Sequence, residues 1–173
     1  MSQASVISDC AARVSGLGDA LLNGIDAQRA ARFANGSGGP INANHPVFVY
    51  GHLSLYNAML ITMLGKDASD AKVPDTYEGL FKHGVECVDD PQGEVYPSLA
   101  EVVTHFKRGT QAAIKAVESC TDEELDAQTP EEGFRSLSPT VGGIANFLLN
   151  DHTMFHLGQV STWRRCEGLG SAM

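Results

Sequence analysis

Positive charge is scarce in this sequence. Its 12 Lys and Arg residues stand against 21 Asp and Glu residues, which gives a formal net charge of −9 at pH 7. No basic cluster interrupts this acidic background. Phosphate backbones and anionic lipid surfaces are themselves negative, so they repel such a chain at long range. We therefore expect neither a nucleic-acid partner nor a membrane-surface role.

Long hydrophobic runs are also absent. The longest apolar run, near residues 58–64, is far shorter than the roughly 20 residues that a membrane-spanning helix requires. The opening residues, MSQASVISDC, contain no cationic stretch followed by an apolar block. We therefore expect no membrane span and no secretion signal.

The cysteines form no paired motif. None of the four lies in a C-x-x-C pair, which excludes a zinc knuckle and a thioredoxin-like redox pair. They are Cys10, Cys87, Cys120 and Cys166. Isolated thiols are typical of proteins in a reducing compartment. This pattern favours a cytoplasmic protein.

Alternating runs of β-branched residues are missing, so no segment is predicted to be a strand. Apolar residues instead recur at steps of three and four, which is the spacing of one helix face. The pattern predicts four long helices, near residues 4–33, 46–64, 98–119 and 139–166. Ser98 and Glu101 have capping-box spacing at the start of the third helix, and Pro139 suits the first turn of the fourth.

The segment between the second and third helices lacks helical periodicity. Proline and glycine interrupt residues 65–96, which predicts a long crossover with one short helix near residues 77–83. A further short turn of helix is predicted at residues 121–124. A chain of 173 residues suits one domain. We expect an all-α four-helix bundle, with the crossover between helices two and three, as a single domain over residues 1–173.

Three histidines lie on apolar helix faces. His152 and His156 are four residues apart, so a helix places both imidazoles on one side. His52 lies in the apolar stripe of the second helix. Three neutral imidazoles leave lone pairs unsatisfied in an apolar core, and a divalent metal would satisfy all three. Hydrogen-bonded core histidines are the alternative interpretation, and the spacing alone does not exclude it.

Two neighbouring kinds of metal site are excluded by the motif. A zinc protease needs a glutamate immediately after its first histidine, and Thr153 stands there. The paired Glu-x-x-His motifs of di-iron bundles are absent as well. The pattern therefore favours one metal ion rather than two.

Gly51-His52 and the block from His152 through His156, Gly158 and Gln159 resemble the DinB/YfiT-like superfamily of bacterial metal-binding bundles. In that family the metal is bound by a histidine after a glycine on the second helix and by an H-x-x-x-H pair followed by a small residue and Gln on the fourth. The resemblance covers helix order and crossover placement over nearly the whole chain. It implies that His52, His152 and His156 are the metal ligands.

The resemblance also implies chemistry. Three protein nitrogens leave open coordination positions, as in catalytic rather than closed structural sites. Zinc or nickel is expected, and iron also suits imidazole. Some members resemble S-transferases that use a low-molecular-weight thiol, so we expect a metalloenzyme acting on a small electrophilic substrate. A non-catalytic metal-binding or stress-response module is the alternative, and an apo dimerisation scaffold is a third. No catalytic residue is assigned, and we expect a homodimer.

The remaining histidines are assigned other roles. His45 is expected at the entry of the second helix, and His83 on the surface, with pocket lining as a minority role. His105 follows Glu101 by four residues, which predicts a solvated ion pair. Protons compete for the metal-binding lone pairs, so metal affinity is expected to fall below about pH 6.

Five other residues near the histidines carry expectations. Tyr56 shares the His52 face and is expected to pack in the core. Gln159 is placed either to orient an imidazole or to form an interhelical hydrogen bond. Gly158 inside a helix indicates a close helix crossing. Arg164 and Arg165 are expected to stabilise the end of their own helix through its macrodipole.

Overall fold

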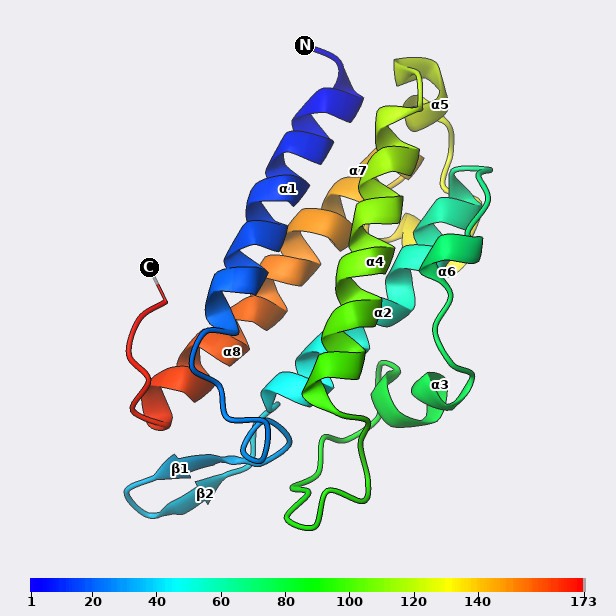
Figure 1. Cartoon of the computed structure of the whole chain (residues 1–173). Coiled ribbons are helices and arrows are strands. Elements are labelled where there is room, and N and C mark those ends of the chain that lie inside the picture. The colour runs from blue at the N-terminus through cyan, green and yellow to red at the C-terminus, as the bar shows by residue number, and fades with distance from the viewer. Residues whose placement is uncertain (173) are drawn as a thin grey trace.

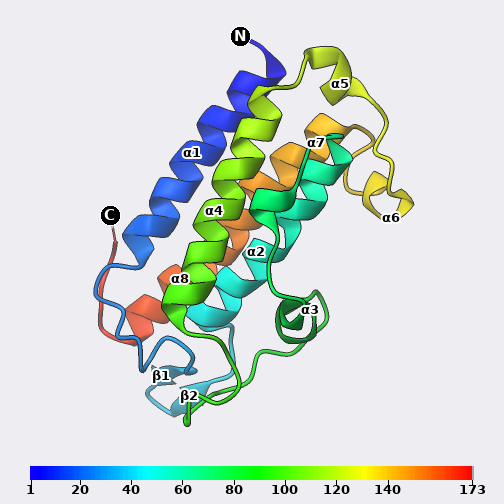
Figure 2. The ribbon, with the colours of Figure 1, turned by 45° about the vertical axis from the view of Figure 1, so that its right-hand side comes forward.

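Long helices make up most of the computed structural model, which describes residues 1–172. Three of them are α1 (Gln3–Leu21), α2 (Pro46–Met63) and α4 (Leu99–Glu118). The fourth consists of α7 (Val141–Asn146), the π-helical segment η2 (Phe147–His152) and α8 (Thr153–Cys166), which follow one another directly. Figures 1 and 2 show these rods lying side by side as one bundle. The prediction of an all-α four-helix bundle is confirmed.

The predicted crossover joins α2 to α4. It contains the short 3-10 helix η1 (Ser69–Ala71) and then α3 (Thr76–Phe81), which packs against α2. The predicted helical turn near residue 122 is α5 (Asp122–Asp126), and Thr121 and Glu124 form its complete capping box. A further short helix, α6 (Glu132–Arg135), was not predicted. Within residues 1–172, no helix combines the length and the apolar character that crossing a membrane requires.

The first helix is shorter than predicted, because it ends at Leu21 and not near residue 33. Gly24 follows with φ of +76°, a left-handed conformation that interrupts a helix and suits glycine. Turns then lead to a hairpin that was also missed, formed by β1 (Ala34–Gly36) and β2 (Gly39–Ile41). The glycine-rich stretch of residues 35–39 forms the tip of this hairpin.

The starts of the third and fourth helices differ in detail from the prediction. Ser98 Oγ accepts a hydrogen bond from the Glu101 N–H at 3.2 Å, but the Glu101 carboxylate accepts one from the Tyr77 hydroxyl, so only half of the expected capping box is formed. Pro139 precedes the fourth helix instead of entering its first turn. Thr140 is the N-cap, since its hydroxyl accepts a hydrogen bond from Gly143 N–H at 3.2 Å.

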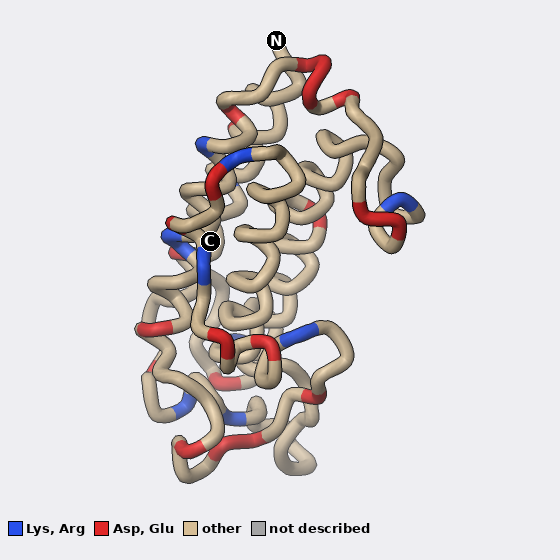
Figure 3. Tube along the Cα trace, turned by 90° about the vertical axis from the view of Figure 1, so that its right-hand side faces the viewer, with Lys and Arg blue, Asp and Glu red and all other residues tan. Residues whose placement is uncertain are grey.

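The charged positions are unevenly distributed over the bundle. Acidic positions gather at the α5 and α6 end and around the crossover loops (Figure 3). The 18 residues of α2 include no Asp, Glu, Lys or Arg. Much of the first half of α2 is buried on every side, where it packs against α3, α4 and α8. His52 is therefore carried by the least polar element of the bundle.

Candidate metal centre

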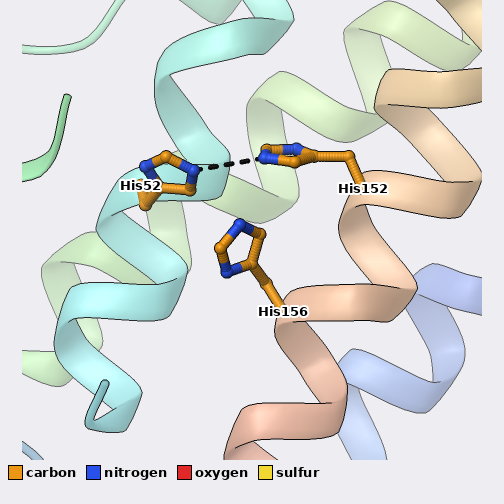
Figure 4. Close-up of side chains that lie close together, drawn as sticks. All are labelled: His52, His152 and His156. Carbon is orange, nitrogen blue, oxygen red and sulfur yellow. Dashed lines mark hydrogen bonds between the residues drawn. The ribbon is translucent and has the colours of Figure 1, made fainter. Parts of the chain in front are cut away.

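Three histidines meet where α2 lies beside the fourth helix (Figure 4). His52 comes from α2, His152 from the last position of η2, and His156 from α8. The ligand-capable atoms that they offer all lie within 4.8 Å of one another. The Nε2 atoms of His52 and His152 are 3.2 Å apart. In a tetrahedral zinc site with bonds of about 2.0–2.1 Å, neighbouring nitrogens are separated by about 3.3 Å. The spacing therefore suits a divalent metal.

Hydrogen bonds fix the orientation of two of the rings. His52 Nδ1 lies 2.7 Å from the Phe81 carbonyl, which can only accept, so this nitrogen carries the proton. His156 Nδ1 donates in the same way to Gln159 Oε1 at 3.0 Å. In the neutral rings, both Nε2 atoms are then unprotonated, and that of His52 lies at hydrogen-bonding distance, 3.2 Å, from His152 Nε2 (Figure 4). This is the tautomer that a metal ligand requires, with the other nitrogen held by a protein acceptor.

Gly51 makes the His52 hydrogen bond possible. A Cβ atom at position 51 would lie 2.5 Å from Cε1 of Phe81, which is a severe overlap. The Phe81 ring is completely buried and has no free space to move into. The glycine at position 51 therefore lets α3 approach α2 closely. The carbonyl of Phe81, the last residue of α3, can then reach the imidazole of His52.

An irregular turn carries His152. In η2 the helix widens by one residue, and Thr153 Oγ1 donates to the Leu148 carbonyl five residues earlier, at 2.9 Å. One inserted residue changes the phase of a helix by about 100°. Ile144 and Leu148 can therefore pack into the core before the insertion, while His152 faces α2 after it. Such π turns are frequent at functional sites.

Burial keeps the three rings neutral. Desolvation lowers the pKa of His52 to about 4 and is the largest cause of its shift. It also lowers the pKa of His152 to about 3, with the neighbouring histidines adding to the effect. The pKa of His156 is lowered by the same cause, against the opposing effect of its hydrogen bond to Gln159. Neutral imidazole is the form that binds a metal.

A pocket of about 380 Å³ opens over the histidines. Its walls come from α2, from α8 and from the loop after α3. The lining residues are Asn44, Phe48, His52, Lys82, His83, Gly84, Val85, His152, Phe155 and His156. A small molecule can therefore reach the three imidazoles from solvent.

Sequence reasoning missed Asn44, which takes part in holding the site. Its Nδ2 donates to Gln159 Oε1 at 3.0 Å, so this oxygen accepts from both Asn44 and His156. The expected orientation of an imidazole by Gln159 is thereby confirmed, whereas its second hydrogen bond joins α8 to the loop before α2 and not to another helix. The only local signal for Asn44 was its place just before the entry of the second helix.

The other histidines lie outside this cluster. His45 is the N-cap of α2, as predicted: its Nδ1 accepts from Phe48 N–H at 3.1 Å, and its Nε2 donates to the Val88 carbonyl at 3.2 Å. His83 is exposed and also lines the pocket. The ion pair predicted for His105 is wrong. Its Nδ1 accepts from the Arg108 guanidinium instead, and its ring packs edge-on to Tyr77.

The predictions for two neighbours of the histidine cluster, Tyr56 and Gly158, had different outcomes. The Tyr56 ring lies half-buried against His52 and His152, with 5.1 Å between ring centroids in both pairs. The close helix crossing expected at Gly158 is wrong, since a Cβ there would meet no atom within 4 Å. Gly158 instead faces a groove between α1 and α8.

The role expected for Arg164 is also wrong, because its guanidinium does not serve its own helix. It is buried and donates to the carbonyls of Leu21 and Asn23, where α1 ends. The backbone there turns at Gly24, and the carbonyls need a partner. Arg165 is exposed, and its expected effect on the macrodipole stays a prediction.

Fold and site together define an all-α bundle with a histidine cluster that could hold a metal ion. The sequence model of the DinB superfamily matches residues 7–160. The chain therefore belongs to the DinB superfamily. Searches of curated proteins and of solved structures returned no significant match.

Proposed function

We propose that the protein binds one divalent metal ion through His52, His152 and His156. The observation that supports this most strongly is the pair of fixed tautomers, because acceptors on Nδ1 of His52 and of His156 leave both Nε2 atoms unprotonated, in a cluster whose ligand-capable atoms lie within 4.8 Å of one another. Zinc and nickel are the expected ions, and iron suits the same ligands.

We further propose a thiol-dependent S-transferase that acts on small electrophiles. When bound, a divalent metal supplies the Lewis acidity that lowers the pKa of a thiol or water beside it. The three histidines hold the ion, while the Phe81 carbonyl and Gln159 keep two of the rings oriented. The thiol cosubstrate and the electrophile would enter through the pocket over the histidines. We also propose that the chain is a single domain, that it forms a homodimer and that it is cytoplasmic.

The residues that line the pocket bear on which chemistry is favoured. Within residues 1–172, the pocket lining contains no Asp or Glu that could act as a general base. A transferase that uses a thiolate can work without such a base, whereas a hydrolase depends on one more strongly. The missing carboxylate therefore favours thiol transfer over hydrolysis and leaves the non-catalytic module as the second candidate.

Metal content tests the ligand assignment. Protein expressed without a histidine tag should contain about one metal ion per chain. Replacing His52, His152 or His156 with Ala should remove most of the binding, and a second replacement should add little, because ligands of one ion are not additive. His105→Ala is the matched control and should leave the stoichiometry unchanged. Full metal occupancy in His52→Ala, together with its loss in His152→Ala, would show that no shared site exists.

Turnover distinguishes the two functions. A chloro-nitro aromatic electrophile is mixed with a panel of bacterial low-molecular-weight thiols, and thioether formation is followed with metal-loaded and metal-free protein. Turnover by the loaded protein alone supports the transferase. Equal, background rates with every thiol support the non-catalytic module.

A further inference from the structure

The rim of the pocket carries positive charge in an otherwise acidic chain. Lys82 is the one Lys or Arg among the lining residues that the structure describes, and these lining residues include no Asp or Glu. Another wall of the pocket comes from α2, which bears no charged residue. The lining of the pocket over the histidines thus contains a cation and no carboxylate, although the net charge of the molecule is −9.

The position of Lys82 is tied to the histidine cluster. It directly follows Phe81, whose carbonyl accepts the Nδ1–H of His52 at 2.7 Å. Because the Phe81 carbonyl is bonded to the imidazole, the backbone at Lys82 lies next to the histidine cluster, and its long side chain starts from the rim of the pocket. The ion pair that Lys82 forms is weak. Lys82 Nζ lies 3.5 Å from the Glu78 carboxylate, and the two side chains are 64% and 72% exposed. An exposed pair of this kind is easily replaced by another anion.

The α8 side of the pocket supplies an apolar surface. Phe155 is 67% exposed, and its ring packs edge-on to His156 with 5.2 Å between centroids. Val85 and Phe48 also line the pocket. An exposed aromatic ring at the mouth of a polar site is a contact surface for the apolar part of a ligand.

We propose that the pocket selects small aromatic carboxylates, with the anionic group paired by Lys82 Nζ and the ring lying against Phe155. A volume of about 380 Å³ suits a molecule of this size, since small-molecule sites span about 300–1,000 Å³. This substrate class rests on the proposed function of the same site. The pairing with Lys82 needs no metal, so it can be tested separately.

The test compares phenylacetate with its neutral isostere phenylacetamide by NMR titration at low ionic strength. Wild-type protein should bind the acid about three- to fivefold more tightly than the amide. Lys82→Gln should abolish this preference, and Phe155→Ala should weaken both ligands by similar factors. Lys107→Gln, which removes an exposed lysine of α4 that is paired with Asp19 of α1, is the matched charge control and should keep the preference.

For each protein, the preference is the affinity for phenylacetate divided by the affinity for phenylacetamide. The deciding quantity is the preference of wild type divided by the preference of Lys82→Gln. It is measured on zinc-loaded and on chelator-treated protein. Any direct bond between carboxylate and zinc is common to both proteins and cancels in this ratio. A ratio of about three to five in each state supports the proposal, and a ratio of one overturns it. Metal analysis reports on the proposed function independently, so the failure of one proposal is distinguishable from the failure of the other.

Discussion

Single hydrogen bonds decide what the histidine cluster can do. An imidazole binds a metal with one nitrogen, and the proton on the other nitrogen is held by an acceptor of the protein. His52 uses a backbone carbonyl for this purpose, and His156 uses the Gln159 amide. The carbonyl cannot be changed by mutation, but the amide can. Gln159 is therefore the residue at which the orientation of a proposed ligand is open to test.

Gln159→Leu should lower the zinc affinity about 10- to 100-fold, because the substitution removes the acceptor of the His156 Nδ1–H and keeps most of the side-chain volume. Competition with a chromophoric chelator measures the change. Gln159→Glu retains an acceptor and should keep most of the affinity. Thr162→Val, one turn further along α8, is the control. Wild-type affinity in Gln159→Leu would show that this hydrogen bond has no role in metal binding.

Burial of imidazoles also makes stability depend on pH. Desolvation lowers the pKa of His45 and of His52 to about 4, below the ordinary value of 6.5. In the unfolded chain both rings take up protons near pH 6.5, whereas in the folded state they stay neutral until about pH 4. The free energy of unfolding of metal-free protein should therefore fall as the pH drops from 6.5 to 4.

Urea unfolding at several pH values measures this slope. His45→Asn keeps an N-cap acceptor for α2 and removes one titrating ring, so its slope should be shallower than that of wild type. Parallel slopes in the two proteins would contradict the assigned pKa of His45. The lowered pKa values also move the expected loss of metal affinity from about pH 6 toward pH 4, since protons compete less well for buried rings.

At the scale of secondary-structure elements, local signals located α2 and α4 to within about one residue. His45-Pro46 begins α2 and Ser98 begins α4, and both signals lie in the sequence itself. The end of α1 was missed, because the apolar spacing continues through Ile25 while the helix ends at Leu21. The Asn23-Gly24 turn there is supported by Arg164, more than a hundred residues away. No periodicity argument contains that contact.

The candidate metal site could likewise be predicted only in part. Spacing on two helices, together with the family resemblance, selected the three histidines that the structure brings together. It could not find the Phe81 carbonyl, since a backbone group has no sequence signature, nor Lys82, since the path of the crossover is set by tertiary packing. The π turn of η2 was also invisible, because the apolar spacing through residues 141–157 reads as one regular helix.

Neighbouring arginines on α8 offer a test of how α1 ends. Arg164→Met should destabilise the protein by about 2–3 kcal/mol, because the buried Leu21 carbonyl at the end of α1 loses a charged donor. Arg165→Met should change the free energy of unfolding by no more than about 0.5 kcal/mol, because this side chain is exposed. Urea denaturation measures both. Equal effects of the two substitutions would show that the Arg164 hydrogen bonds do not stabilise the fold.

For the whole molecule, the acidic surface and the proposed metal site act in the same direction. A net charge of −9 attracts divalent cations and disfavours phosphate backbones. Two clusters of buried hydrophobic residues, one at each end of the bundle, stabilise the chain independently of the histidines. The metal-free protein is therefore expected to fold, and a bound ion adds to a stability that already exists.

Metal binding should raise the Tm by mass action, because an ion that binds only the folded chain stabilises it. At a free zinc concentration 100 times the Kd, the added stability is about 2.7 kcal/mol. For a chain of 173 residues, each kcal/mol raises the Tm by about 2–4 °C, so the expected rise is about 5–11 °C. Differential scanning calorimetry with and without zinc measures it.

The triple variant His52→Ala, His152→Ala, His156→Ala separates this effect from unspecific binding of zinc to the acidic surface. It should fold, since its two hydrophobic clusters are intact, and its Tm should not respond to zinc. His105→Ala, which changes a histidine outside the cluster, should keep the full rise. A zinc-dependent rise of the same size in the triple variant would place the stabilising ion elsewhere on the molecule. Because the comparison needs no substrate, it tests the metal site whether or not the protein is an enzyme.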